Sequence, residues 1–231
     1  HRAVAKTCGG CGTTTEARVP GFASGRVQYG PGVKARAAWL TCAHFLPVRR
    51  ARRVLNALLG FTVSDGWVAG LRAQAARLLE TRFLPHVRAL IAAAPVAHAD
   101  ETTARAAGAL TYLHVACTQF LTVMHVGDRT GDTIDDDMIL RFTVNLAVPF
   151  TNNTAELPAR SVKVQQRTSG GSWRTLQGLI NFAVVRSYLS TATKWGIDTL
   201  EAMTRLFTTG PWLPPALTPD LATPCHCSMA G

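Results

Sequence analysis

Acidic residues are scarce in the first part of this 231-residue chain, whose formal net charge is +10. Residues 1–90 hold three acids against fourteen Lys and Arg residues, residues 91–157 hold eight acids against three Arg, and the remainder holds three against seven. Basic flanks around an acidic centre suit a protein that holds a polyanion by its phosphates and presents carboxylates to cations. An Arg-rich solvated surface is the alternative that charge alone leaves open.

Long apolar runs are also missing. No run approaches the roughly eighteen residues needed to cross a bilayer, and the N-terminus lacks the residue order of a signal peptide. We therefore expect a cytoplasmic protein with no membrane contact. Hydrophobic residues make up 47% of the chain, which is enough for one substantial domain or two small ones. The chain starts at His1 without Met, so we expect it to be truncated at the N-terminus.

A second cysteine pair is missing near the first. Cys8 and Cys11 form a CxxC motif in "CGGCG", whereas tetrahedral zinc needs four ligands. The other cysteines offer no local partner, because two lie in apolar surroundings and two flank a histidine in a distant Pro-rich tail (Cys42, Cys117; Cys225, His226, Cys227). We expect a partial zinc knuckle, with a complete Zn²⁺ site as the less favoured alternative.

Helical spacing dominates residues 30–94. The stretch "GPGVKARAAWLTCAHFLPVRRARRVLNALLG" predicts a helix with a break near Pro47 and a stop at Gly60. Ser64 is well placed to cap a second helix over "TVSDGWVAGLRAQAARLLETRFLPHVRALIAAA". Two helices joined by a short turn are a helix-turn-helix candidate, and a plain helical hairpin is the alternative. The candidate DNA contacts on the first helix are Arg49, Arg50, Arg52 and Arg53.

Residues 95–126 change to short β-rich runs, "PVAHADETT", "ALTYLHVACT" and "FLTVMHV", separated by "ARAAG" and "TQ". They predict a three-stranded antiparallel meander. His98 and Asp100 are two residues apart and share one face of the first strand, while Glu101 points to the other. We expect His114 and His125, on the neighbouring strands, to be able to approach the face of Asp100.

The C-terminal part returns to helices. "ILRFTVNLAVPFTNNTAELPARSVKVQQ" leads into the first, and Asn153 with Glu156 has the spacing of a capping box. This capping role and a catalytic role are equally open for Glu156. "LQGLINFAVVRSYLSTATKW" and "DTLEAMTRLF" predict two further helices, the second with Asp198 and Glu201 as another capping box.

Several segments, in chain order, resemble the insertion sequence 66 transposase family. "HADET", "PFTNNTAE", "VKVQQRTSGGSWRTLQG", "RSYLSTATKWGIDTLEAMTRLF" and "GPWLPP" resemble its catalytic and C-terminal segments. "CGGCG", "VQYGP" and "HFLPVRRARRVL" resemble its N-terminal zinc-knuckle and helical segments. The resemblance implies a DDE-type enzyme with a ribonuclease H-like core, in which three acids hold two divalent ions that cleave and join DNA strands.

The resemblance also implies site residues and partners. Asp100 in "HADET" matches the first catalytic acid, and Glu156 in "NNTAE" matches the third. Carboxylate ligands imply Mg²⁺ or Mn²⁺ as the cofactor. DNA, as element ends and target, is the implied partner, with Lys163 and Arg167 as further DNA contacts, and a homo-oligomer is compatible with the family.

One family segment has no counterpart here. The strand that carries the second acid in a "HD" motif is missing, and an internal deletion joining near Asp136 explains its absence. We therefore expect a defective transposase whose sheet edge and apolar surface are left uncovered. A DNA-binding remnant that occupies element ends without cutting is the alternative. A metal-dependent hydrolase or nuclease that uses His98, Asp100 and Glu156 is a third, less favoured hypothesis.

The expected fold class is α/β, with an incomplete ribonuclease H-like core, made of the meander and helices, after an N-terminal helical region. The expected divisions are a partial zinc knuckle, a helical region with the helix-turn-helix candidate, the β-meander, the helical C-terminal part of the core and a Pro-rich tail (1–17, 18–94, 95–136, 137–210 and 211–231).

Overall fold

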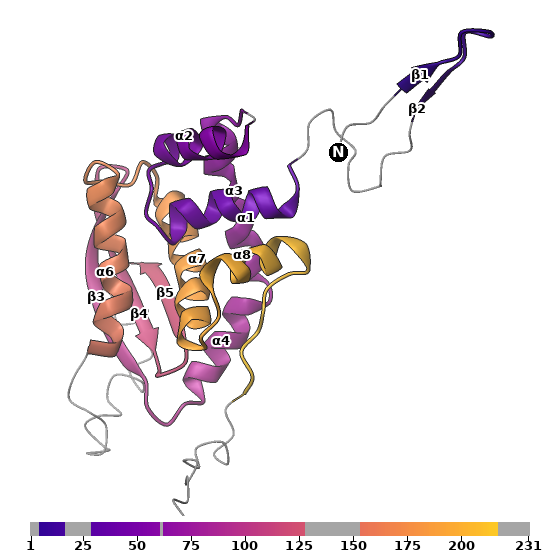
Figure 1. Cartoon of the computed structure of the whole chain (residues 1–231). Coiled ribbons are helices and arrows are strands. Elements are labelled where there is room, and N and C mark those ends of the chain that lie inside the picture. Colours follow the sequence, from indigo (N-terminus) through magenta and orange to yellow (C-terminus); the bar gives the residue numbers. More distant parts are fainter. Residues whose placement is uncertain (1–4, 17–28, 61, 128–152, 217–231) are drawn as a thin grey trace, which may run out of the picture. The chain divides into compact units, whose positions relative to one another are not determined.

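The computed structural model describes residues 5–16, 29–60, 62–127 and 153–216. The chain divides into two compact units, His1–Gly30 and Pro31–Gly231. In the first unit, strands β1 (Ala5–Thr7) and β2 (Thr14–Glu16) form an antiparallel hairpin (Figure 1). The second unit is mixed α/β, and its described part holds a three-stranded antiparallel sheet and seven helices.

The sheet confirms the predicted meander. Its strands are β3 (His98–Ala106), β4 (Ala109–Cys117) and β5 (Thr122–Gly127), in the order β3-β4-β5. Strand β3 runs three residues into "ARAAG", which we expected to be a separator. The turn needs only Ala107 and Gly108, whose φ angles of 52° and 83° suit a two-residue hairpin.

Four helices precede the sheet, namely α1 (Pro31–Cys42), α2 (Val48–Leu59), α3 (Asp65–Glu80) and α4 (Phe83–Ala92). The predicted helix ends are confirmed. Gly60 ends α2 with a φ of 68°, and the Ser64 hydroxyl accepts a hydrogen bond of 3.1 Å from the Trp67 N–H at the start of α3. The second predicted helix divides in two, and this division puts Pro85 in the first turn of α4, where its missing N–H costs nothing.

Among the residues that the structure describes after the sheet, the helices are α6 (Asn153–Thr168), α7 (Leu176–Lys194) and α8 (Thr199–Thr208). Asp198 caps α8 as predicted, since its Oδ1 accepts from the N–H groups of Leu200 and Glu201 at 2.9 and 3.0 Å. The side chain of Asn153 lies outside the described residues, as do the acidic stretch 128–137 and the expected junction near Asp136.

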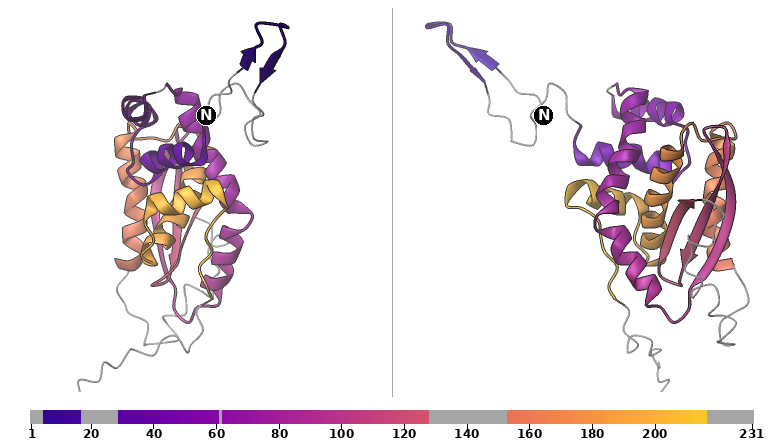
Figure 2. Two further views of the ribbon diagram at one scale, coloured as in Figure 1. Left: turned by 45° about the vertical axis from the view of Figure 1, so that its right-hand side comes forward. Right: turned by 180° about the vertical axis from the view of Figure 1, so that it is seen from behind.

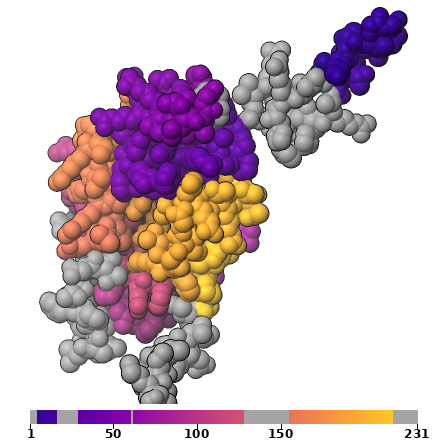
Figure 3. Space-filling view, in the orientation of Figure 1, coloured from indigo at the N-terminus to yellow at the C-terminus, as the bar shows by residue number. Residues whose placement is uncertain are grey.

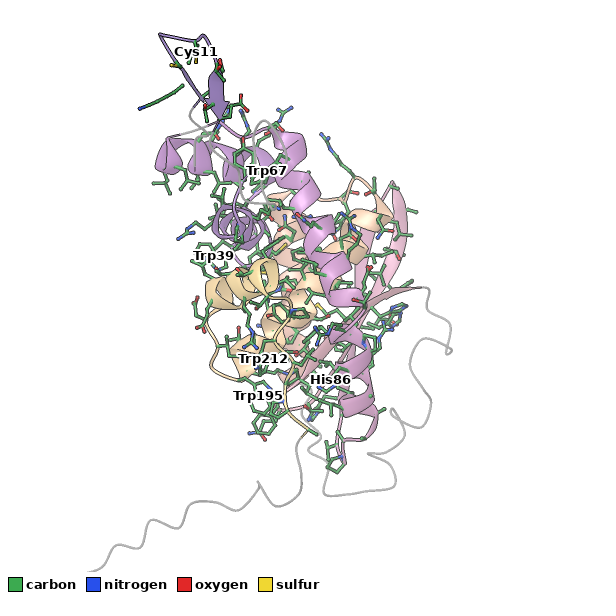
Figure 4. The ribbon with its side chains drawn as sticks, turned by 90° about the vertical axis from the view of Figure 1, so that its right-hand side faces the viewer. Cys11, Trp39, Trp67, His86, Trp195 and Trp212 are labelled. Carbon is green, nitrogen blue, oxygen red and sulfur yellow. The ribbon has the colours of Figure 1, made fainter. Side chains whose placement is uncertain are left out.

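The core lies between the sheet and the helices. Helix α6 packs against β3 and β4, α7 packs against β5, and α1 packs against α8 (Figures 1 and 2). The sheet face with Leu113, Val115 and Met124 is buried. Trp39 of α1 donates its indole N–H to the Thr199 hydroxyl of α8 at 2.9 Å (Figure 4). Among the described residues, no helix combines the length and apolarity needed to traverse a bilayer.

Helix α7 closes the outer edge of β5 with hydroxyl groups. The Ser187 hydroxyl accepts from the Met124 N–H at 2.8 Å. The Thr191 hydroxyl accepts from the Thr122 N–H at 3.1 Å and donates to the Thr122 carbonyl at 3.2 Å. The buried edge of the sheet is therefore paired with side chains of a helix rather than with another strand.

The first residues of the Pro-rich tail are packed against the helices of the second unit. The Trp212 N–H donates to the Tyr188 hydroxyl at 3.2 Å, and His86 hydrogen-bonds the Pro214 carbonyl at 2.7 Å. Trp212 also stacks edge-on against Trp195, with ring centroids 5.8 Å apart (Figure 4). Aromatic packing thus extends the folded unit at least to residue 214.

Candidate carboxylate site beside strand β3

Asp100 and Glu156 lie within electrostatic reach of each other, although 55 residues separate them in the chain. Asp100 is on β3, and Glu156 is in the first turn of α6. Burial raises the pKa of Asp100 above its ordinary value, and the neighbouring charges of Glu156 and Glu101 raise it further. A hydrogen bond of 2.8 Å from the Glu101 N–H to Asp100 Oδ1 opposes this shift. Two carboxylates that repel each other in this way are suited to share a cation.

The alignment of α6 with β3 explains this proximity. Lys163 donates to the Thr103 hydroxyl at 2.9 Å and to the Thr103 carbonyl. Glu156 lies seven residues before Lys163, hence on the same side of the helix and about 10 Å back along it. Asp100 lies three residues before Thr103, also about 10 Å back along the strand. Because α6 and β3 run side by side (Figure 1), Glu156 is level with Asp100.

Glu156 already has a counter-charge. The Arg160 guanidinium, one helical turn later, lies 3.1 Å from Glu156 Oε2, and the Glu156 side chain is 48% exposed. A cation bound between the two acids would compete with this ion pair.

The strand register places the two histidines on the opposite face from Asp100. Asp100 pairs with Val115, whereas Glu101 pairs with His114, which in turn pairs with His125. Directly paired residues share a face, so the expectation that the histidines approach Asp100 is wrong. His114 Nδ1 lies 3.7 Å from Glu101 Oε2 instead. His98 does share the Asp100 face, as its spacing predicted, and pairs with Cys117.

The carboxylates of Asp100 and Glu156 are ligands of the type that a divalent cation binds, but they are few. Carboxylate oxygens are the ligands that Mg²⁺ and Mn²⁺ prefer. Within the described residues, no group of three His, Cys, Asp or Glu side chains is placed to hold a metal ion. Asp100 and Glu156 are therefore two candidate ligands where the family resemblance implies three acids.

The outer edge of β3 is covered where we expected it to be bare. Lys163 caps the Thr103 carbonyl, the Trp173 N–H donates to the Arg105 carbonyl at 2.8 Å, and the Ala107 N–H donates to the Trp173 carbonyl at 3.0 Å. The expectation of an uncovered edge is therefore wrong from residue 103 to residue 107. None of these contacts had a signal in the sequence, because each joins residues that are sixty or more positions apart in the chain.

The N-terminal hairpin presents two thiols at its tip. Cys8 and Cys11 are both exposed, and the turn is closed by hydrogen bonds of 2.9 Å from Cys8 N–H to the Thr13 carbonyl and from Gly12 N–H to the Cys8 carbonyl. Hydrogen bonds to Thr13, and then to Cys8, lower the pKa of Cys11 to about 7. This tip has the form of half a zinc site, and Cys225, His226 and Cys227 lie outside the described residues.

The four candidate arginines of α2 fall into two groups. Arg52 Nε lies 2.8 Å from Asp65 Oδ1, and Arg49 Nε lies 3.8 Å from Asp65 Oδ2, so both tie α2 to α3. Arg50 and Arg53 are exposed. The turn between α2 and α3 suits a helix-turn-helix and a plain hairpin equally.

One comparison with known families gives a match to the part of the chain that contains Asp100. Residues 26–138 match the model of the transposase IS66 family. This match, over somewhat less than half of the chain, is consistent with a fragment of an IS66 transposase. The matched residues include α1 to α4, the sheet and Asp100, whereas Glu156 lies beyond them. No curated protein and no solved structure matches the chain. The family implies a role in transposition and DNA as the partner.

Proposed function

We propose that this chain is an IS66 transposase whose Asp100 and Glu156 belong to a metal-dependent strand-transfer site, and that this copy has lost strand transfer. The observation that carries the proposal is the proximity of the two acids. They come from segments that separately resemble the first and third catalytic motifs, and the charge of Glu156 raises the pKa of Asp100.

The residues of the chain have distinct parts in such a site. Asp100 and Glu156 would hold a divalent cation. When bound, such a cation would activate an attacking water or 3′-hydroxyl and stabilise the leaving oxygen. Lys163 anchors α6 to β3 and so keeps Glu156 level with Asp100. Because the pKa of Asp100 is raised, cation binding displaces a proton more often here than at an exposed aspartate.

The covered edge of β3 supports the loss of strand transfer. A rigid strand with the second acid would have to lie beside Asp100, as the family resemblance implies. Along β3 from residue 103 onward, Lys163 and Trp173 already occupy the backbone groups with which such a strand would pair. Two acids give the ions fewer ligands and a looser geometry than a three-acid site.

A strand-transfer assay with Mg²⁺ or Mn²⁺ on matching element ends tests the proposal. We expect no joined product above background. Robust product formation that Asp100→Ala abolishes would show that the copy is active. This result would overturn the proposed loss of strand transfer, whereas the proposed role as a transposase would stand.

A second candidate function is a DNA-binding remnant that occupies element ends. The exposed Arg50 and Arg53 on α2 favour it, since they are available to contact phosphates. Sequence-specific binding with a steep salt dependence and no cleavage would support it, whereas binding to unrelated DNA with equal affinity would contradict it.

A further inference from the structure

Three arginines that are far apart in the sequence gather at the end of β3 away from Asp100. They are Arg105 on β3, Arg167 at the end of α6 and Arg174 in the loop before α7. We propose that these three arginines bind the phosphate backbone of DNA. This inference rests on the proposed function for the identity of the polyanion.

The loop between α6 and α7 places Arg174. Its residue Trp173 forms a parallel bridge with Ala106, and the loop hydrogen-bonds to β3 on both sides of that bridge. Side chains alternate along extended backbone, so Trp173 and Ala106, both buried, share the core face. Arg174 and Arg105 consequently lie together on the outer face, and both are exposed.

An aromatic stack gives this loop a rigid base. The Arg72 guanidinium carbon lies 5.4 Å from the ring centroids of both Trp173 and Phe182, and the two rings are 4.9 Å apart. Trp173 is 6% exposed. Because its side chain is held between α3 and α7, the neighbouring Arg174 has a defined place at the sheet end.

Helix α6 places Arg167 at the same end. Glu156, Arg160, Lys163 and Arg167 recur at helical spacing and form one stripe along the helix. Lys163 reaches Thr103 at the edge of β3. Arg167 is one turn further, about 6 Å, which matches the two strand residues from Thr103 to Arg105. Figures 1 and 2 show α6 beside β3, and Figure 3 shows α6 on the surface.

The arginines of this unit differ in whether a carboxylate lies beside them. Arg160 is neutralised by Glu156, and the two arginines of α2 next to Asp65 are also paired. Within the described residues, Arg105, Arg167 and Arg174 have no carboxylate within 4.0 Å. Unpaired arginines at fixed positions favour phosphate oxygens as partners.

The α6 stripe from Glu156 to Arg167 is long enough for several nucleotides rather than one small anion. Arg167 lies eleven positions after Glu156, which corresponds to about 16 Å along α6. With a rise of about 3.4 Å per nucleotide of a B-form strand, this is about five nucleotides. A strand that follows this stripe would pass Glu156 at one end and bring its phosphates to Arg167 and the neighbouring arginines at the other.

The test is a fluorescence-anisotropy titration of a labelled DNA duplex over a range of salt concentrations, without divalent cation. The test variant combines Arg105→Gln, Arg167→Gln and Arg174→Gln. The matched control combines Arg77→Gln, Arg82→Gln and Arg205→Gln, which remove equal charge from exposed positions on other elements. We expect the slope of log affinity against log salt to become shallower by about 2 to 3 in the test variant, at about 0.7 to 0.9 per lost contact, and to change little in the control.

The outcomes distinguish a failure of the arginine site from a failure of the proposed function. An equal change of slope in both triple variants would overturn the phosphate site, because it would reflect net charge alone. Failure of the unsubstituted chain to bind DNA at low salt would contradict the proposed function itself. If circular dichroism shows that the triple variant is unfolded, the single substitutions Arg105→Gln and Arg174→Gln replace it. Each should then lower the slope by about 0.7 to 0.9, and an unchanged slope in both would overturn the site.

Discussion

At the scale of single residues, Asp100 is destabilising in its ionised form. It is partly buried, and the nearby charge of Glu156 opposes its ionisation. Folded chains therefore bind its proton more tightly than unfolded chains do. The free energy of unfolding consequently falls as pH rises from the ordinary pKa of 3.8 through the raised pKa of Asp100. Residues that cost stability in this way are common in functional sites.

Replacing Asp100 by Asn should therefore stabilise the protein at pH 7. The amide keeps an oxygen for the Glu101 N–H and removes the repulsion with Glu156. We expect a higher melting temperature than that of the unsubstituted chain at pH 7, and a smaller difference below the ordinary pKa of 3.8, where both side chains are neutral. Asp198→Asn, which keeps a helix cap, is the control and should show little change. A lower melting temperature for Asp100→Asn at pH 7 would contradict the raised pKa.

At the scale of elements, one lysine contributes to the alignment of α6 with β3. The helix packs against β3 and β4, and Lys163 joins it to the edge of β3 through Thr103. Pro158 lies inside the helix and removes one backbone hydrogen bond near Glu156. Side-chain contacts therefore contribute more to the alignment of α6 with β3. The level arrangement of Glu156 and Asp100 follows from this anchor.

Lys163→Met should loosen α6 without unfolding the sheet. It keeps the aliphatic stem and removes the donor to Thr103, so we expect the free energy of unfolding to fall by about 1 kcal/mol. Denaturant titration measures this loss, and hydrogen exchange should show less protection in α6 than in β4. Leu157→Met, at an exposed position of the same helix, is the control. Equal loss of protection in both elements would contradict a local anchor.

At the scale of the whole second unit, α7 holds the sheet and the C-terminal helices together. Its residues Phe182, Tyr188 and Leu189 are buried, and its hydroxyl groups complete the outer edge of β5. Because these contacts join segments on either side of residues 128–152, the strands and the C-terminal helices should unfold in a single transition.

Thr191→Val tests this coupling, because it keeps the shape of the side chain and removes both hydrogen bonds to Thr122. The buried Thr122 N–H is then left without its partner, and we expect a loss of about 1 to 3 kcal/mol in the free energy of unfolding. Thr193→Val is the matched control, since its hydroxyl bonds the Leu189 carbonyl within the helix. Coincident transitions by fluorescence and circular dichroism are expected for both variants. A cost for Thr191→Val no larger than that of the control would show that the edge contact adds nothing.

The sequence by itself determined the local features. Gly60, Ser64 and Asp198 predicted helix ends correctly, because capping depends on a few neighbouring residues. Alternation predicted the meander and the shared face of His98 and Asp100, and the family resemblance agrees with the match over residues 26–138. The length of β3 was missed, because "ARA" has no turn signal or strand signal of its own.

Only the tertiary structure decided which side chains meet. The face on which His114 and His125 lie depends on strand register, since a shift of one residue would move them to the other side. The proximity of Asp100 and Glu156, the capping of β3 by Lys163 and Trp173, and the gathering of Arg105, Arg167 and Arg174 all depend on how α6 and its loop pack on the sheet. Such long-range packing has no pattern within any one segment, because it results from burying apolar faces of several segments at once.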